Sequence, residues 1–81
     1  MKILYFAWLR ERIGLPHEMH ETNAATVMDL INELRARDEH YAHAFNDLSA
    51  LRVALDHELS EFDAPLTGVS EVAFFPPMTG G

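Results

Sequence analysis

The sequence contains no cysteine, and it has only four glycines and four prolines among 81 residues. The missing thiols exclude disulfide scaffolds, cysteine-ligated zinc or iron–sulfur centres, thiol nucleophiles and cysteine persulfides. Little glycine and proline, with 48% hydrophobic and 23% charged residues, argues against collagen-like repeats, low-complexity sequence and disorder. A chain of this length predicts one small globular domain.

Basic residues are also scarce, six against thirteen acidic ones, so the formal net charge is −7. This charge repels phosphate backbones and anionic lipids, and we expect neither nucleic acid nor a membrane as a partner. No apolar run approaches the roughly 20 residues that span a bilayer, and the first residues lack the cleavage site of a secretion signal. We therefore expect a soluble, cytoplasmic protein, whose acidity serves solubility or a partner with a basic patch.

Motifs of catalytic and metal sites are missing as well. There is no Gly-x-Ser-x-Gly, no glycine-rich phosphate loop and no His-Glu-x-x-His. His40 and His43 stand three residues apart on a predicted helix, but the spacing supplies no third ligand. His17 and His20 fall on a weak predicted strand. We therefore expect no catalytic residue and no metal site in this chain.

Helical periodicity is clearest in the middle of the sequence. Apolar residues spaced three and four apart predict a main helix over residues 27–37, and Thr26 with Asp29 resembles a capping box at its start. Asp38 can cap a second short helix, in which Tyr41, Ala44, Phe45 and Leu48 repeat the spacing. A short helical turn is expected over residues 8–13, stopped by Gly14.

Strand signals surround these helices. Residues 3–7 predict a first strand that is apolar on both faces, and residues 17–22 a weak edge strand beside it. On the first strand, one face carries Ile3, Tyr5 and Ala7, and the other face carries Lys2, Leu4 and Phe6. Residues 51–55 and 58–62 predict a hairpin joined by Asp56-His57, since both residue types tolerate positive φ. Residues 71–75 predict the last strand, which Pro76-Pro77 ends.

This order predicts an α+β ubiquitin-like β-grasp: a mixed sheet of four or five strands packed on the main helix, with a short second helix. An α+β sandwich of another topology also fits the pattern. We expect the domain over residues 1–75 and an extended tail over residues 76–81. The predicted core contains Ile3, Val27, Leu30, Leu34, Val53, Leu55, Val72 and Phe74.

The end of the chain is the most distinctive segment: Phe74, Phe75, Pro76, Pro77, Met78, Thr79, Gly80 and Gly81. The prolines keep its base extended, and glycines without side chains can enter a narrow tunnel. From Pro76 to Gly81 the reach is at most about 20 Å, enough to carry a terminal carboxylate into the active site of another protein. A frayed terminus is the alternative interpretation.

This ending resembles the small, sulfur-carrying subunit of molybdopterin synthase, as do the opening Lys2-Ile3-Leu4-Tyr5-Phe6-Ala7 and the segment Phe62-Asp63-Ala64-Pro65-Leu66. The resemblance covers the whole length and is most specific at the C-terminus. Two turns depart from the family pattern: Asp56 stands where an Asn is common, and residues 68–72 replace a common Asp-Gly-Asp-Glu-Val.

The resemblance implies a mechanism. An activating enzyme related to ubiquitin-activating enzymes would adenylate the Gly81 carboxylate with ATP, and a sulfur donor would displace AMP to leave a thiocarboxylate. The tail, residues Pro76, Pro77, Met78, Thr79, Gly80 and Gly81, would then enter the large synthase subunit and give its sulfur to a cyclic pyranopterin precursor. The large subunit would supply the catalytic groups, in a heterotetramer with two copies of each chain. No permanently bound cofactor is implied, only a transient acyl adenylate.

The resemblance also implies partner contacts at Phe6, Arg10, Leu59 and Phe75, and strand alternation places the three apolar ones away from the core. Two other functions remain open at this point. The thiazole-forming sulfur carrier of thiamine synthesis also ends in Gly-Gly on a β-grasp. A ubiquitin-like modifier or binding module would use the same sheet without carrying sulfur.

Overall fold

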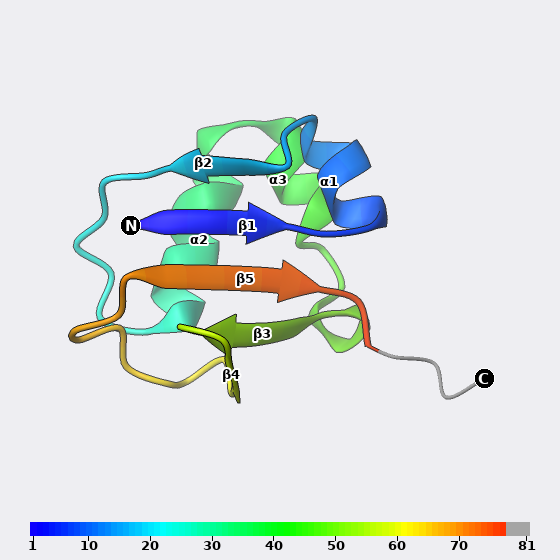
Figure 1. Ribbon diagram of the computed structural model, residues 1–81. Coiled ribbons are helices and arrows are strands. Elements are labelled where there is room, and N and C mark those ends of the chain that lie inside the picture. The colour runs from blue at the N-terminus through cyan, green and yellow to red at the C-terminus, as the bar shows by residue number, and fades with distance from the viewer. Residues whose placement is uncertain (78–81) are drawn as a thin grey trace.

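A mixed five-stranded sheet with helices packed behind it forms the domain (Figure 1). The computed structural model describes residues 1–77. In chain order the elements are β1 (Lys2–Tyr5), α1 (Trp8–Ile13), β2 (His17–Met19), α2 (Val27–Arg37), α3 (Glu39–Ala44), the 3-10 turn η1 (Leu48–Ala50), β3 (Arg52–Leu55), β4 (Glu58–Ser60) and β5 (Glu71–Phe75). The strand order β2-β1-β5-β3-β4, with β1 and β5 parallel and the other pairs antiparallel, confirms the β-grasp prediction.

The main helix begins where its cap predicts. The Thr26 hydroxyl accepts a hydrogen bond from the Asp29 backbone N–H at 3.2 Å, which satisfies a donor that the first helical turn leaves free. The helix buries one stripe, formed by Val27, Leu30, Ile31 and Leu34. Since α2 is the longest helix among the described residues and has only 11 residues, no helix in residues 1–77 can cross a membrane.

Every residue of the predicted core is buried. Three aromatic rings join them between the sheet and the helices: Tyr5 stacks on Phe74 with centroids 6.4 Å apart, and Phe45 meets Phe74 edge-on at 5.0 Å. Leu9 and Ile13 also join the core from α1, in which six residues are too few to show a clear period. The 3-10 turn η1 was not predicted from the sequence, because three residues carry no detectable period.

Several predicted strands end early. The first strand stops at Tyr5, so the predicted extension to Ala7 is wrong: Ala7 is exposed and turns the chain with φ 55°. The strands predicted over residues 17–22 and 58–62 stop at Met19 and Ser60. Both lie at the edges of the sheet, where one neighbour instead of two supports the ladder.

The Asp56-His57 turn is confirmed. Its residues have φ of 48° and 74°, the left-handed values that a two-residue hairpin turn needs at both positions. The Asp56 carboxylate also accepts hydrogen bonds from the backbone N–H groups of Ser70, at 3.1 Å, and Glu71, at 2.9 Å. The Asp56 side chain therefore ties the β3–β4 turn to the start of β5.

Candidate functional site

The outward face of the sheet carries a row of apolar side chains. In the strand register Leu4 lies beside Ala73, Ala73 beside Ala54, and Ala54 beside Leu59, so one residue from each of β1, β5, β3 and β4 forms the row. Residues next to each other across a sheet point to the same face. The core residues alternate with them on the opposite face, where α2 packs (Figure 1).

A shallow depression of about 480 Å³ lies along this row. Its floor contains the small residues Ala54 and Ala73, while larger apolar side chains surround them. The lining consists of Leu4, Phe6, Ala54, His57, Glu71, Ala73, Phe75 and Pro76. Small side chains between large ones create the hollow, since every strand keeps the same distance from its neighbour.

Phe6 and Phe75 lie at the end of the depression where the tail begins. The backbone N–H of Phe6 donates to the carbonyl of Phe74 at 3.1 Å, so Phe6 extends the parallel ladder beyond β1. The Phe6 side chain is 45% exposed, and Phe75 is half-buried. Large exposed apolar groups on a small acidic protein mark a surface for another molecule.

The rim of the depression is polar. His57 Nε2 lies 3.4 Å from Glu71 Oε2, with the imidazole largely exposed and the carboxylate largely covered. At the other end of β3, Arg52 lies beside Phe75 in the register, and its guanidinium donates to the Leu51 carbonyl at 2.8 Å. An apolar centre with a charged rim is the usual anatomy of a protein interface.

The structure brings two of the four predicted contact residues together. Phe6 and Phe75 line the same depression. Leu59, 72% exposed, belongs to the same outward row but lines a neighbouring groove with Arg52 and Ser60. Arg10 is exposed on α1 and does not line the depression. The partner contacts themselves stay predictions.

Four residues that line the depression were not predicted from the sequence as site residues: Ala54, His57, Glu71 and Ala73. Ala54 and Ala73 each stand beside a core residue in an alternating strand, so their outward direction was readable. That they lie side by side depends on pairing between strands distant in sequence. Pro76 and Pro77 of the predicted tail are half-buried, and Met78, Thr79, Gly80 and Gly81 lie outside the described residues.

The most polar buried cluster lies behind the sheet and surrounds Glu18. The hydroxyls of Tyr5 and Tyr41 donate to Glu18 Oε2 at 2.8 and 2.6 Å, and Arg37 donates to Oε1 at 2.9 Å. Burial favours the neutral carboxyl, but these three hydrogen bonds outweigh it and hold the pKa of Glu18 below its usual value. Burial and the bond to Glu18 raise the pKa of Tyr41 to about 12. Because all three donors are occupied by one carboxylate, the cluster links β1, β2, α2 and α3 and leaves no free acid or base.

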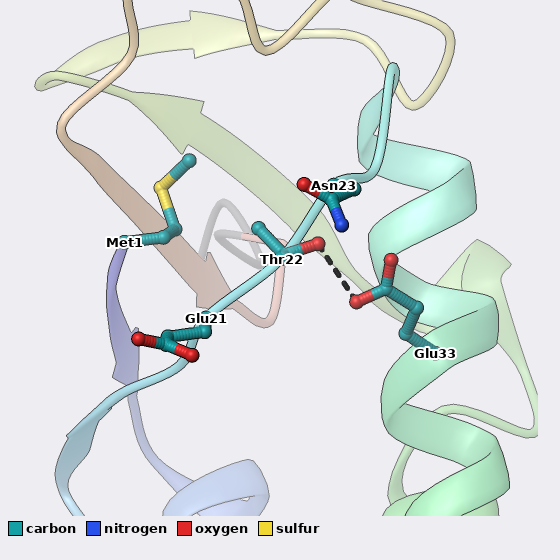
Figure 2. Close-up of a pocket in the computed structure, with 5 residues that line it drawn as sticks. All are labelled: Met1, Glu21, Thr22, Asn23 and Glu33. Atoms are coloured by element: carbon teal, nitrogen blue, oxygen red, sulfur yellow. Dashed lines mark hydrogen bonds between the residues drawn. The ribbon is translucent and has the colours of Figure 1, made fainter.

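A larger hollow opens beside the start of β1, lined by Met1, Glu21, Thr22, Asn23 and Glu33 (Figure 2). One of its two carboxylates is already engaged, because Glu33 Oε1 accepts from the Thr22 hydroxyl at 2.7 Å and lies 3.1 Å from His20 Nε2. Figure 2 shows the Thr22 hydroxyl turned toward Glu33, with the Met1 and Glu21 side chains on the other side of the loop that follows β2. Within residues 1–77 no group of three or more His, Asp or Glu side chains could hold a metal ion. The outward face is therefore the stronger candidate site.

Comparison with known sequences gives a match to the ThiS family over residues 3–81. Two proteins called molybdopterin synthase sulfur carrier subunit are similar over the full length. The one from Escherichia coli (strain K12) is 40% identical over 81 residues, covering 100% of this chain and 99% of that protein. The one from Haemophilus influenzae is 32% identical, with the same coverage of both chains.

Two solved structures share the fold. The crystal structure of SAMP1 from Haloferax volcanii superimposes with a TM-score of 0.74 at 25% identity, over 100% of this chain and 98% of that one. A putative molybdopterin converting factor, subunit 1, from Pyrococcus furiosus gives a TM-score of 0.69 at 25% identity, over 95% of each chain.

Proposed function

Because the chain belongs to the ThiS family, we propose that it is the small, sulfur-carrying subunit of molybdopterin synthase. The observation that carries the proposal is the full-length similarity to two proteins of that name, at 40% and 32% identity. The match extends to residue 81, so it includes the Gly80-Gly81 ending. The names of these relatives favour molybdopterin over the thiazole-forming carrier, which the Gly-Gly ending alone left open.

The proposed chemistry takes place on the Gly81 carboxylate. A carboxylate is a poor electrophile, so an activating enzyme first attaches it to the α-phosphate of ATP, and pyrophosphate leaves. Hydrosulfide (HS⁻) delivered by a sulfur donor then attacks the acyl carbon and displaces AMP; with loss of its proton, the added sulfur leaves Gly81 as a thiocarboxylate. With no cysteine in the chain, the terminal carbonyl is the one place that can hold this reactive sulfur covalently.

The outward face supplies the docking surface in this proposal. Phe6 and Phe75 stand where β5 leads into Pro76, so a partner that covers the depression also receives the tail in a defined direction. Leu59 extends the contact along the same face, and Arg10, exposed on α1, would add a polar contact. The large subunit contributes the acid–base groups that turn the delivered sulfur into a dithiolene. This chain contributes the sulfur and the docking.

The test is reconstitution with the activating enzyme, ATP, a sulfur donor and the large subunit. Intact-mass measurement is expected to show a gain of about 16 Da, the exchange of one oxygen for sulfur. Deleting Gly81 is expected to abolish this gain and the sulfur transfer, because the new carboxylate stops about 3.3 Å short of both active sites. The melting temperature of the shortened chain is the control and should stay the same. Full transfer by the shortened chain, or no binding of the intact chain to the large subunit, would refute the proposal.

A further inference from the structure

Ala7 holds a backbone conformation that alanine rarely adopts. Its φ of 55° and ψ of −134° are those of the first central residue in a type II′ turn, a position that normally requires glycine. The turn is closed by a hydrogen bond from the Leu9 N–H to the Phe6 carbonyl at 3.2 Å. The other non-glycine residues with positive φ in the described part of the chain, Asp56 and His57, belong to the hairpin already described.

This turn separates two parts of the candidate docking surface. Before it, Phe6 is bound into the ladder beside β5 and faces outward. After it, α1 buries Leu9 and Ile13 and leaves Arg10 exposed. A strand continued through Ala7 would run on beside Phe75 and Pro76, and α1 could not return to the core. The turn therefore determines where the apolar face ends and where Arg10 lies relative to it.

Packing does not explain alanine at this position, because Ala7 is exposed. Backbone strain of this kind persists where the surrounding structure holds it, and it gathers at functional positions. We infer that Ala7 is a positioning residue: the ladder before the turn and the buried Leu9 after it hold the turn, and the methyl group leaves the backbone fewer alternative conformations than glycine would, so that Phe6 and Arg10 keep the orientation that the synthase partner binds. The inference rests on the proposed function, since it concerns the same docking surface.

Two variants at this position separate strain from positioning. Ala7→Gly relieves the strain but frees the hinge. Replacement of Ala7 by D-alanine, in a chain made by chemical synthesis, relieves the strain and keeps the hinge fixed, because the mirror image of this φ and ψ is a relaxed extended conformation of an L residue. We expect the glycine variant to melt at the same or a higher temperature. It should bind the large subunit about two- to tenfold more weakly, because binding must then order one more flexible group. The D-alanine variant is expected to melt at a higher temperature and to bind at least as tightly as the wild type.

A matched control comes from the exposed Ala36 on α2, which lies on the helical side of the molecule. Ala36→Gly is expected to lower the melting temperature and leave the affinity unchanged, the opposite of Ala7→Gly. The single tryptophan, Trp8, follows the turn directly, so its fluorescence anisotropy reports local order without any partner. We expect lower Trp8 anisotropy in the glycine variant and wild-type anisotropy in the D-alanine variant.

Three results would overturn the inference about Ala7. Equal affinity of the glycine variant and the wild type would show that the hinge does not position the docking residues. Lower melting temperatures for both Ala7 variants would show that the turn holds no strain. Weaker binding by the D-alanine variant would assign the effect to the methyl group itself. Failure of the wild type to bind the large subunit would instead refute the proposed function, and the stability and anisotropy results would remain separate from it.

Discussion

Phe74 and Phe75 are the same residue type at neighbouring positions, yet they belong to two different regions of the molecule. Phe74 points to the inner face of the sheet, is fully buried, stacks on Tyr5 and meets Phe45 edge-on. Phe75 points to the outer face and lines the depression beside Phe6. One step along a strand reverses the direction of the side chain, so stability and recognition can be divided between adjacent residues. The comparison teaches that composition alone does not assign a role to an aromatic residue in this sheet.

The largest expected effect comes from a substitution on the inner face of the sheet. Phe74→Ala should lower the free energy of unfolding by about 3–5 kcal/mol, because it leaves a cavity between the sheet and α3. Urea unfolding followed by circular dichroism measures this loss. A loss below about 1 kcal/mol would show that the buried aromatic cluster is not the stabilising centre of the domain.

Phe75→Ala tests the outer side. It should weaken binding to the large subunit about thirtyfold, the effect of losing a central contact, and change the free energy of unfolding by less than about 1 kcal/mol. Titration calorimetry measures the affinity. Met19→Ala is the matched control, since Met19 is 74% exposed and does not line the depression. Strong destabilisation by Phe75→Ala with unchanged affinity would mean that the two faces are assigned the wrong way round.

The pH dependence of stability should come from the inner side, through Glu18. Because its pKa is lowered in the folded state, its contribution is fully present above the unfolded value of 4.5 and is lost as the pH falls below it. Glu18→Gln should lower the free energy of unfolding by about 1–3 kcal/mol at pH 7. It should also reduce the loss of stability at acidic pH, here called the acid limb. Denaturation at a series of pH values provides the measurement, and an unchanged acid limb in the variant would assign the loss to other carboxylates.

Tyr41 should produce a loss of stability at alkaline pH, here called the alkaline limb. Its pKa is raised to about 12 in the folded state, so its contribution is present below the ordinary value of 10.0 and is lost as the pH rises toward 12. Tyr41→Phe is the variant that removes this limb while keeping the ring. An alkaline limb that persists in the variant would point to Tyr5, whose pKa is also raised by burial.

The smallest expected effect concerns the turn at the rim of the outer face. His57 has φ 74°, which glycine adopts without strain, so His57→Gly should stabilise the domain by about 0.5–1 kcal/mol. The lost contact with Glu71 offsets little of this, because the imidazole is 85% exposed. Thermal unfolding measures the gain. A destabilised variant would show that the His57–Glu71 pair matters more than the backbone strain.

Local patterns predicted the parts of the molecule that depend on neighbouring residues. The bounds of α2, its Thr26 cap, the bounds of β5 and the positive φ of Asp56 and His57 all agree with the prediction. Each depends on periodicity or on turn chemistry within a few residues. The ends of the edge strands, η1 and the turn at Ala7 escaped prediction because they are short and depend on what packs against them.

The candidate site divides in the same way. Alternation placed Phe6 and Phe75 outside the core, and the Gly-Gly ending indicated a carrier. The depression between them depends on Ala54 and Ala73, which meet only because β3 and β5 pair across a long connection. The Glu18 cluster was equally hidden, since its donors Tyr5, Arg37 and Tyr41 are 13, 19 and 23 residues away in the sequence.

The sequence by itself determined which residues are buried and which are exposed along α2 and β5, because the period of 2 or 3.6 residues is set by the local backbone geometry. The absence of cysteine also directed the proposed sulfur chemistry to the Gly81 carboxylate. Only the tertiary structure decided which outward residues share a surface, where β1 stops, and that alanine must turn the chain with positive φ. The physical reason is that strand pairing and core packing act between residues distant in sequence, and their combined free energy exceeds the local cost of about 1–3 kcal/mol of one strained residue.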